Sequence, residues 1–282
     1  MSGWGVLLSW HADPVVVAGI AAFAGTFLLG VRRAERLRPG SVGATRVRWF
    51  AAAVLILVLA LCSPIATVSE RRFSVHMVQH LLLLFGAAPL LALAAPVTLA
   101  LQAATPAVRQ RWLLPLLRSR ALKVASFPVL TWLGFAGVMY VTHFSGIYDA
   151  SLGNPLLHGV EHLLYLAAAA LFWWPVVRRD PVPGVFPWPA RLLYLLLAMP
   201  LQSMLGLAIY SSDRVLYDRY TAALGAARAL DDQHLAGAIM WVGGDVCMLV
   251  AIGIAIAAWM RLDTRRTAEL DARLDAARAA AR

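Results

Sequence analysis

The sequence predicts an all-α polytopic membrane protein whose chain crosses the bilayer seven times. Of its 282 residues, 61% are hydrophobic and 14% are charged, which is too apolar for an ordinary soluble domain. Near-spanning apolar runs recur along the chain, and they lie at 14–31, 47–65, 75–101, 124–142, 156–177, 191–211 and 234–260. We therefore predict a transmembrane domain over 1–260 and a basic cytoplasmic tail over 261–282.

Basic residues predict the orientation of the chain. Of the 25 Lys and Arg side chains, twenty fall in stretches that alternate loops place on one side: 32–48, 102–123, 178–191 and 261–282. Because basic residues gather in cytoplasmic loops, we expect the N-terminus outside and the C-terminus inside the cell. The same pattern explains the net charge of +10 as an orientation signal. It predicts the inner (plasma) membrane as location and membrane lipid, but not nucleic acid, as a partner.

Capping residues and prolines refine the helix boundaries. Asn154 followed by Pro155 suits the start of the fifth helix. Ser74 is placed to cap the third helix. Asp231 and Asp232 suit the start of the seventh helix, where the helix dipole favours negative charge. Kinks are expected where proline removes a backbone hydrogen bond, namely at Pro89, Pro96 and Pro200.

Histidines give the clearest functional signal. All seven are predicted to lie on the outer side, and four form two H-x-x-x-H pairs, His76 with His80 and His158 with His162. Residues four apart share a helix face, so each pair can offer two imidazoles to one metal ion. A single histidine at a helix end is commonly an interfacial residue, but two pairs on one side favour a metal or haem site. We predict that the pairs meet in one polar cavity between the third and fifth helices.

Further ligands are expected at similar depth. His143 lies at the outer end of the fourth helix, whereas His11 and His234 flank the first and seventh helices. Softer donors nearby are Met77, Met139, Met204, Met240 and Cys62. Imidazole combined with sulfur suits copper, especially Cu(I), while zinc and haem iron stay open as alternatives. The predicted metal ligands are His76, His80, His143, His158, His162 and Met77.

Two acids are candidates for supporting roles within the membrane helices. Glu161 lies beside the second histidine pair and could orient a ligand or accept a proton. Asp245 follows His234 by eleven residues, about 16 Å deeper along the helix. An ionisable group at such depth is a functional candidate, with Gln202 and Ser203 as candidate polar partners.

Five segments together carry a resemblance to a known family. They are H-M-V-Q-H-L-L-L-L-F-G-A-A-P-L (76–90), H-F-S-G-I-Y-D-A-S-L-G-N-P-L-L-H-G-V-E-H-L-L-Y-L (143–166), F-W-W-P-V (172–176), D-R-V-L-Y-D-R-Y (213–220) and D-D-Q-H-L-A-G-A-I-M-W-V-G-G-D (231–245). In this combination, the chain resembles the CtaG-type assembly factors of caa3-type cytochrome c oxidase from about residue 45 to 260.

The resemblance implies a seven-helix membrane protein that helps to build cytochrome c oxidase by handling copper. Subunit I of the oxidase, or other assembly factors, would be its partners. His234 stands where the family often has another residue, and His11 lies outside the matched region. The residues that match by position are His76, Met77, Gln79, His80, His143, Tyr148, Asp149, His158, Glu161, His162, Tyr217, Asp232 and Gln233.

The leading functional interpretation is a non-enzymatic metallochaperone, or assembly factor, that binds copper near the outer face. One alternative is a seven-helix zinc-dependent membrane hydrolase, in which three histidines hold zinc and an acid activates water. A second alternative is a haem-binding electron carrier with axial histidines from the third and fifth helices. The methionines around the histidines favour copper over both.

Overall fold

A computed structural model describes residue 10, residues 13–181 and residues 183–280, and these residues form helices without any strand. The all-α membrane fold is therefore confirmed. Six helical stretches are long and apolar enough to cross a membrane: Pro14–Leu37, Ala44–Cys62, Phe73–Ala103, Leu156–Val177, Trp188–Tyr210 and Ala226–Ala280. The remaining predicted run corresponds to α11 (Pro128–Phe144), whose 17 residues extend about 26 Å, just under the hydrocarbon thickness of about 30 Å.

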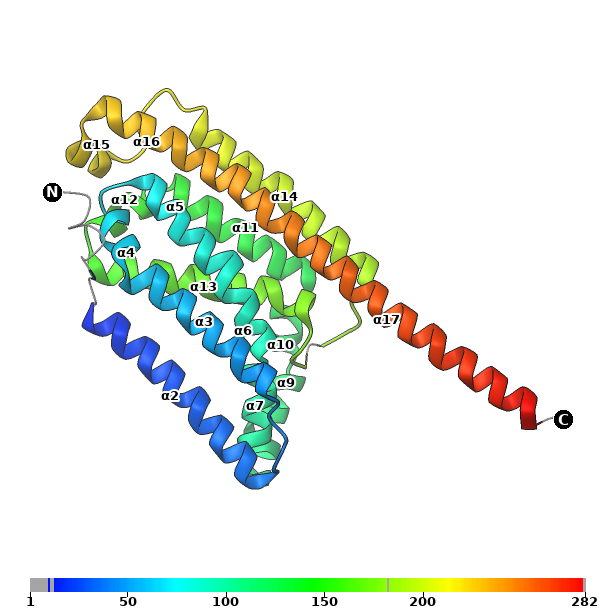
Figure 1. Ribbon diagram of the computed structural model, residues 1–282. Helices are drawn as coiled ribbons and strands as arrows, with labels where there is room; N and C mark the ends of the chain where they lie inside the picture. Colours follow the sequence, from blue (N-terminus) through cyan, green and yellow to red (C-terminus); the bar gives the residue numbers. More distant parts are fainter. Residues whose placement is uncertain (1–9, 11–12, 182, 281–282) are drawn as a thin grey trace.

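The two ends of the helix bundle differ in what they carry (Figure 1). One end, called here the histidine end, is formed by three short helices: α4 (Pro64–Ser69), α12 (Ile147–Leu152) and α15 (Asp218–Leu224). The opposite end carries the short helices α7 (Pro96–Ala103), α8 (Pro106–Val108), η2 (Arg109–Leu113), α9 (Leu114–Arg118) and α10 (Arg120–Ala125). The basic-rich loops lie at this opposite end, as the alternation of loops requires. Which end faces the cytoplasm stays a prediction.

Three helices at the histidine end carry the candidate ligands, and the remaining long helices pack around them. The ligand-bearing helices are α5 (Phe73–Leu81), α11 and α13 (Pro155–Val177). The surrounding helices are α3 (Ala44–Cys62), α6 (Ala88–Ala94), α14 (Trp188–Tyr210), α16 (Ala226–Ala238) and α17 (Gly244–Ala280). Helix α2 (Pro14–Leu37) lies at the edge of the bundle (Figure 1), where Phe27 stacks on Phe50 of α3 with ring centroids 3.6 Å apart.

Close packing of α14 against α16 depends on two glycines. A methyl group at Gly206 would lie 2.7 Å from the backbone nitrogen of Trp241, and one at Gly237 would lie 2.5 Å from that of Tyr210. Both positions therefore need a residue without a side chain, as is common where membrane helices approach closely. This contact fixes α16, which in turn supports the start of α5.

The third predicted helix is interrupted where its prolines are found. Before Pro89 the helix widens into a π-helical segment, η1 (Leu82–Ala87). The helix then ends at Ala94, and Ala95 adopts a left-handed backbone with φ of 50° before Pro96 begins α7. The carboxylate of Asp180 accepts hydrogen bonds from the backbone nitrogens of Val97 and Thr98. The irregularities predicted at Pro89 and Pro96 are therefore confirmed, because proline cannot complete the helical hydrogen bonds there.

Two predicted caps differ in outcome at the histidine end. Asn154 caps α13 as predicted, since its side-chain oxygen accepts from the backbone nitrogen of Leu156 at 3.0 Å. Ser74 does not cap its own helix. Instead, its backbone nitrogen and hydroxyl donate to Asp232 at 3.1 and 2.6 Å. The seventh long helix begins at Ala226 rather than at 234, so Asp232 lies within α16 and serves the N-terminus of α5.

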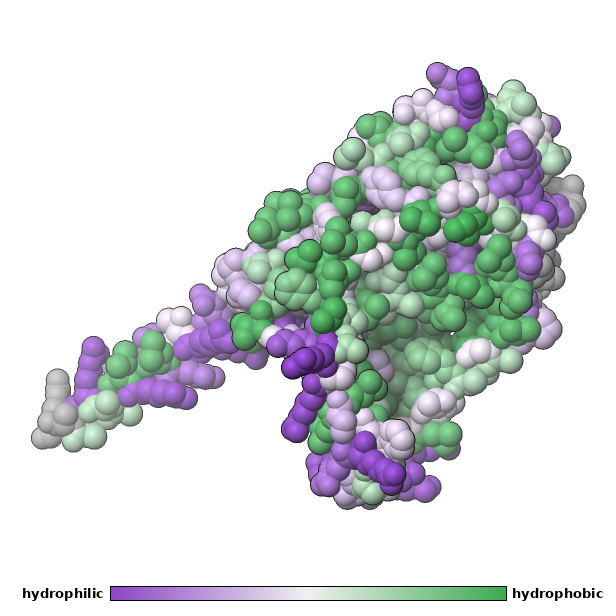
Figure 2. Space-filling model, turned by 180° about the vertical axis from the view of Figure 1, so that it is seen from behind, coloured by the Kyte–Doolittle hydropathy of each residue, from purple (hydrophilic) through white to green (hydrophobic). Residues whose placement is uncertain are grey.

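The surface agrees with a membrane location. Hydrophobic side chains cover the middle of the bundle, and hydrophilic ones gather at its ends and along the projecting tail (Figure 2). The tail is helical as far as Ala280, because α16 continues through the π-helical segment η3 (Ile239–Gly243) into α17. In this way one long run of helix leads from the histidine end into the tail.

Candidate metal centre

Five imidazoles from three helices come together at the histidine end. His76 and His80 project from α5, His158 and His162 from α13, and His143 from the last turn of α11. The ring centroid of His76 lies 5.7 Å from that of His158 and 6.0 Å from that of His162. The centroids of His80 and His143 are 5.7 Å apart. The predicted meeting of the two pairs is thus confirmed, while their role as metal ligands stays a prediction.

Several ring nitrogens of the buried imidazoles have no hydrogen-bond partner among the residues that the structure describes. His76 is fully buried, and neither of its ring nitrogens has a partner. His80 is 2% exposed, and neither of its ring nitrogens has a partner among the described residues. The Nε2 atoms of His143 and His162 are also unpaired. Buried polar atoms are nearly always satisfied, because leaving one unpaired costs free energy. Several such atoms facing one another indicate a site that binds something.

Two subsets of donors are close enough to share an ion. One ligand atom each from His76, His158 and His162 lie within 4.8 Å of one another, and so do those of His76, His80 and Glu161. Metal–nitrogen bonds are about 2 Å long, so donors to one ion are at most about 4 Å apart. Small side-chain adjustments would bring either subset to bonding distance. His76 belongs to both.

His143 is held in the tautomer that a ligand needs. Its Nδ1 lies 2.7 Å from the backbone oxygen of Met139. A carbonyl oxygen can only accept, so Nδ1 carries the proton, and the protonation state follows from this contact. The unpaired Nε2 then presents its lone pair to the cluster. This is the arrangement in which a backbone carbonyl orients a metal-binding histidine.

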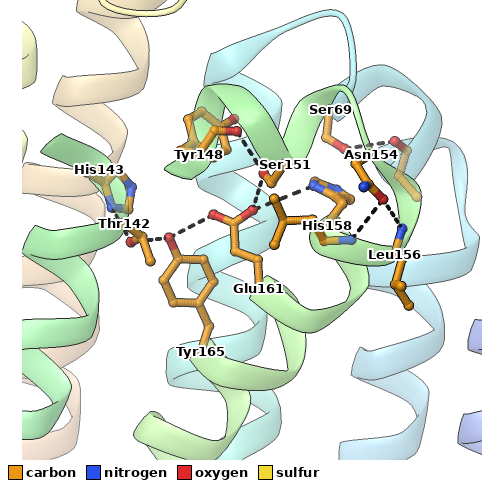
Figure 3. Close-up of polar contacts among 12 residues, drawn as sticks. Ser69, Thr142, His143, Tyr148, Ser151, Asn154, Leu156, His158, Glu161 and Tyr165 are labelled. Carbon is orange, nitrogen blue, oxygen red and sulfur yellow. Dashed lines mark hydrogen bonds and ion pairs between the residues drawn. The ribbon is translucent and has the colours of Figure 1, made fainter. Parts of the chain in front are cut away.

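Glu161 is the acid of the centre, and neighbours from α12 and from its own helix, α13, fix its position (Figure 3). It is 3% exposed. Ser151 of α12 donates to its carboxylate at 2.5 Å, and the hydroxyl of Tyr165 lies 3.0 Å from it. The Nδ1 atom of His158 is 3.7 Å from the same carboxylate. The prediction that Glu161 stands beside the second pair is therefore confirmed.

Tyrosines form the wall of the centre. The ring of Tyr148 lies 4.7 Å from that of His76, and the ring of Tyr165 lies 4.4 Å from that of His80. The Tyr165 hydroxyl also contacts Thr142 of α11 at 2.6 Å. Sequence reasoning missed Tyr165, although its spacing of four from Glu161 places both on one helix face. It also missed Ser151, for which the sequence holds no signal.

A second layer of tyrosines ties the loops to this wall. The hydroxyls of Tyr148 and Tyr220 are 2.5 Å apart, and Tyr220 donates to the backbone oxygen of Ser69. Tyr217 donates to the backbone oxygen of His143 at 3.0 Å. Burial raises the pKa of Tyr148, Tyr217 and Tyr220 above the ordinary tyrosine value. These side chains are therefore neutral donors at physiological pH.

A partly open cavity leads from the histidine end to the cluster. The cavity, called here the vestibule, has a volume of about 300 Å³. His158 and His162 lie along its wall together with Gln79, while Glu70 and Arg219 also line it. The donors that line the vestibule are thus those of α13, and His76 and His80 of α5 are not part of its wall.

Other candidates lie away from the histidines and have structural partners. Gln233 accepts from the backbone nitrogen of Leu216 and donates to the backbone oxygen of Arg214. Asp245 accepts from the hydroxyl of Ser203 at 2.9 Å, as expected for that pair. Together with Asp232, these residues have hydrogen-bond partners outside the cluster, and their predicted supporting role stays a prediction.

The predicted sulfur donors are scattered. Met77 and Met139 belong to the main hydrophobic core, as does Met240, and Met204 is 62% exposed on the surface of the bundle. Cys62 is buried but joins none of the donor groups found in the described residues.

Of the two remaining histidines, the structure describes His234, which lies apart from the five. The Nε2 of His234 lies 3.2 Å from the backbone oxygen of Ser212, and its ring packs on Tyr210. His11 lies outside the described residues.

Comparison with known proteins identifies the family. Residues 25–262 match the family described as cytochrome c oxidase caa3 assembly factor. The chain belongs to this family. The matched stretch contains all five clustered histidines, and the resemblance inferred from the sequence motifs is confirmed.

Relatives of this assembly-factor family member are longer than the chain itself. An uncharacterized protein of Mycobacterium leprae (strain TN) is 30% identical over 281 residues, covering 94% of this chain and 42% of the relative. An uncharacterized protein of Mycobacterium bovis (strain ATCC BAA-935 / AF2122/97) is 26% identical, covering 96% of this chain and 42% of the relative. The chain thus spans less than half the length of these relatives. No solved structure matches.

Proposed function

We propose that the five-histidine centre binds copper and holds it for insertion into a caa3-type cytochrome c oxidase. The observation that carries this proposal is the convergence of five imidazoles, each with a ring nitrogen that is buried and has no hydrogen-bond partner among the described residues. Membership of the oxidase assembly family supplies the biological setting. Imidazoles bind Cu(I) with lower affinity than a cage of thiolates does. Such a site suits a protein that must release its cargo.

A zinc-dependent hydrolase is the second candidate, because three histidines and an acid occur together. His76, His158 and His162 could hold zinc, and Glu161 would be the base that activates water. We favour copper because Glu161 is already engaged by Ser151 and Tyr165. A haem with axial histidines from α5 and α13 is less favoured, because the rings of Tyr148 and Tyr165 pack on His76 and His80, with ring centroids 4.7 and 4.4 Å apart.

The test uses the full chain and a double substitution, His76→Ala with His80→Ala. Purified protein loaded with Cu(I) under reducing conditions should retain copper, whereas the double variant should lose it. His234→Ala is the matched control, because His234 lies at the same end but outside the cluster. Retention of copper by a folded double variant would overturn the proposal. Zinc bound in place of copper, with hydrolytic activity, would favour the second candidate.

The cellular arm measures oxidase assembly. In a strain without its own copy, the double variant should accumulate normally while cytochrome c oxidation falls. Added copper should partly restore it if delivery is the role. Normal oxidase activity with the double variant at full level would leave a role in scaffolding only.

Delivery also needs the histidine end to face outward. Reporter fusions at residues 110 and 280 should behave as cytoplasmic, because both lie on the side with most basic residues. A periplasmic signal from either fusion would reverse the orientation and place the centre on the cytoplasmic side.

A further inference from the structure

The donors of the centre are not equivalent, because they divide into a half-buried pair and a buried group. His158 and His162 are half-buried, and His158 retains 19% side-chain exposure. His76, His80 and Glu161 are 0%, 2% and 3% exposed. In each subset the ligand atoms lie within 4.8 Å of one another, and the two subsets share His76. Among the described residues, no single group holds all five donors within this distance.

An ion that enters through the vestibule reaches one subset of donors before the other. The vestibule is lined by His158 and His162 but not by His76, His80 or Glu161. An ion that arrives through it meets the two imidazoles of α13 first. The buried subset lies behind them, enclosed by Tyr148 and Tyr165.

The chemistry of the subsets also differs. The first offers three neutral imidazoles, whereas the second includes the carboxylate of Glu161. A carboxylate stabilises a cation in a low-dielectric interior more strongly than a neutral ring does. Its position is held by Ser151 and Tyr165, so it does not have to reorganise when an ion arrives. The buried position is therefore the one in which an ion is retained.

We propose that this protein carries its metal ion in two successive positions, a loading position at His158 and His162 with His76 and a holding position at His76 and His80 with Glu161. The proposal rests on copper binding at the cluster. His76 is the shared ligand, and transfer is a ligand exchange. The bonds to His158 and His162 break as those to His80 and Glu161 form, and the metal keeps its oxidation state. Neither ring nitrogen of His76 has a competing partner, so the ring is free to follow the ion.

The experiment separates the two positions by kinetics. Full-length protein is loaded with Ag(I), a stable monovalent analogue of Cu(I), and the ion is then removed with an excess of a water-soluble chelator. Wild-type protein should release most of its ion slowly. His80→Ala should still load but lose the slow phase, because only the loading position remains.

Substitution at the vestibule should have the opposite signature. His158→Ala should load more slowly, by about the 10- to 100-fold typical of altered metal-site residues, yet keep the slow release of the ion once bound. His234→Ala, outside the cluster, should match wild type in both phases. Glu161→Gln keeps the size of the side chain and should shorten the slow phase without loss of folding, which circular dichroism would verify.

The outcomes distinguish this inference from the function on which it rests. If wild-type protein binds neither Cu(I) nor Ag(I), the copper proposal fails. If wild-type protein binds the ion but His80→Ala and His158→Ala change loading and release alike, one undivided site exists, and the two-position inference is overturned while copper binding stands.

Discussion

Two regions of this membrane protein contain polar side chains between helices. The two regions differ in whether these side chains have hydrogen-bond partners. Between α14 and α17, Asp245 meets the hydroxyl of Ser203, and between α5 and α16, Asp232 meets Ser74. In both places each acid has a protein donor. Between α5 and α13, by contrast, the imidazoles of His76 and His80 face one another without partners. We infer from this difference that the acids stabilise the fold, whereas the histidines are available to bind a ligand.

The comparison predicts its largest effect at His80. His80→Leu removes a buried imidazole without orphaning a partner, so the metal-free variant should be as stable as wild type or more so. Free copper at 100 times its dissociation constant should stabilise wild type by about 2.7 kcal/mol and stabilise the variant less, because only the loading position remains in it. Thermal unfolding in detergent, with and without copper, measures both. Strong destabilisation of metal-free His80→Leu would place His80 among the structural polar groups.

Asp232 should behave in the reverse manner. Asp232→Ala leaves the backbone nitrogen of Ser74 without its acceptor and should lower stability by about 1–3 kcal/mol, whether or not copper is present. Asp231→Ala is the matched control, because the neighbouring side chain is exposed. Equal melting temperatures for the two variants would show that the contact between α5 and α16 is dispensable.

A smaller effect is expected at Asp245. Asp245→Asn keeps an oxygen that can accept from Ser203, so stability should change by less than about 1 kcal/mol. Oxidase assembly should be unaffected at equal protein level. Failure of assembly by a stable Asp245→Asn protein would show that this acid belongs with the functional groups and would break the comparison.

Charges along the vestibule should produce the smallest effect. Glu70→Gln should slow Ag(I) loading a few-fold, because the carboxylate attracts the incoming cation. Arg219→Gln should speed loading, because the guanidinium repels the cation. Both changes should fade in high salt. Identical loading rates for the two variants at low salt would mean that the ion does not arrive by this passage.

Much of this arrangement could be predicted from residue spacing. The pairs His76 with His80 and His158 with His162 lie on single helix faces because a helical turn is close to four residues. Apolar run length predicted where most membrane helices lie. His143 was found because the end of an apolar run places it at the same depth as the pairs.

What could not be predicted depends on contacts between distant residues. Ser74 and Asp232 are 158 residues apart, and a sequence shows Ser74 only as a cap for its own helix. Asp180 contacts Thr98 at the start of α7 across 82 residues, and no local pattern shows that partnership. The methionines were expected near the metal because depth alone was known, whereas the direction of each side chain depends on helix rotation.

The π-helical segment η1 determines how α5 is rotated about its axis relative to α6. A π segment accommodates one residue beyond the α-helical count, as if by an insertion. One residue corresponds to about 100° of turn, so η1 sets the phase of His76 and His80 relative to α6, which packs against α13. A deletion of one residue within 82–87 would restore an ordinary α-helix and change that phase by about the same angle. Every ligand would still be present in the chain, yet α5 would turn its imidazoles away from those of α13.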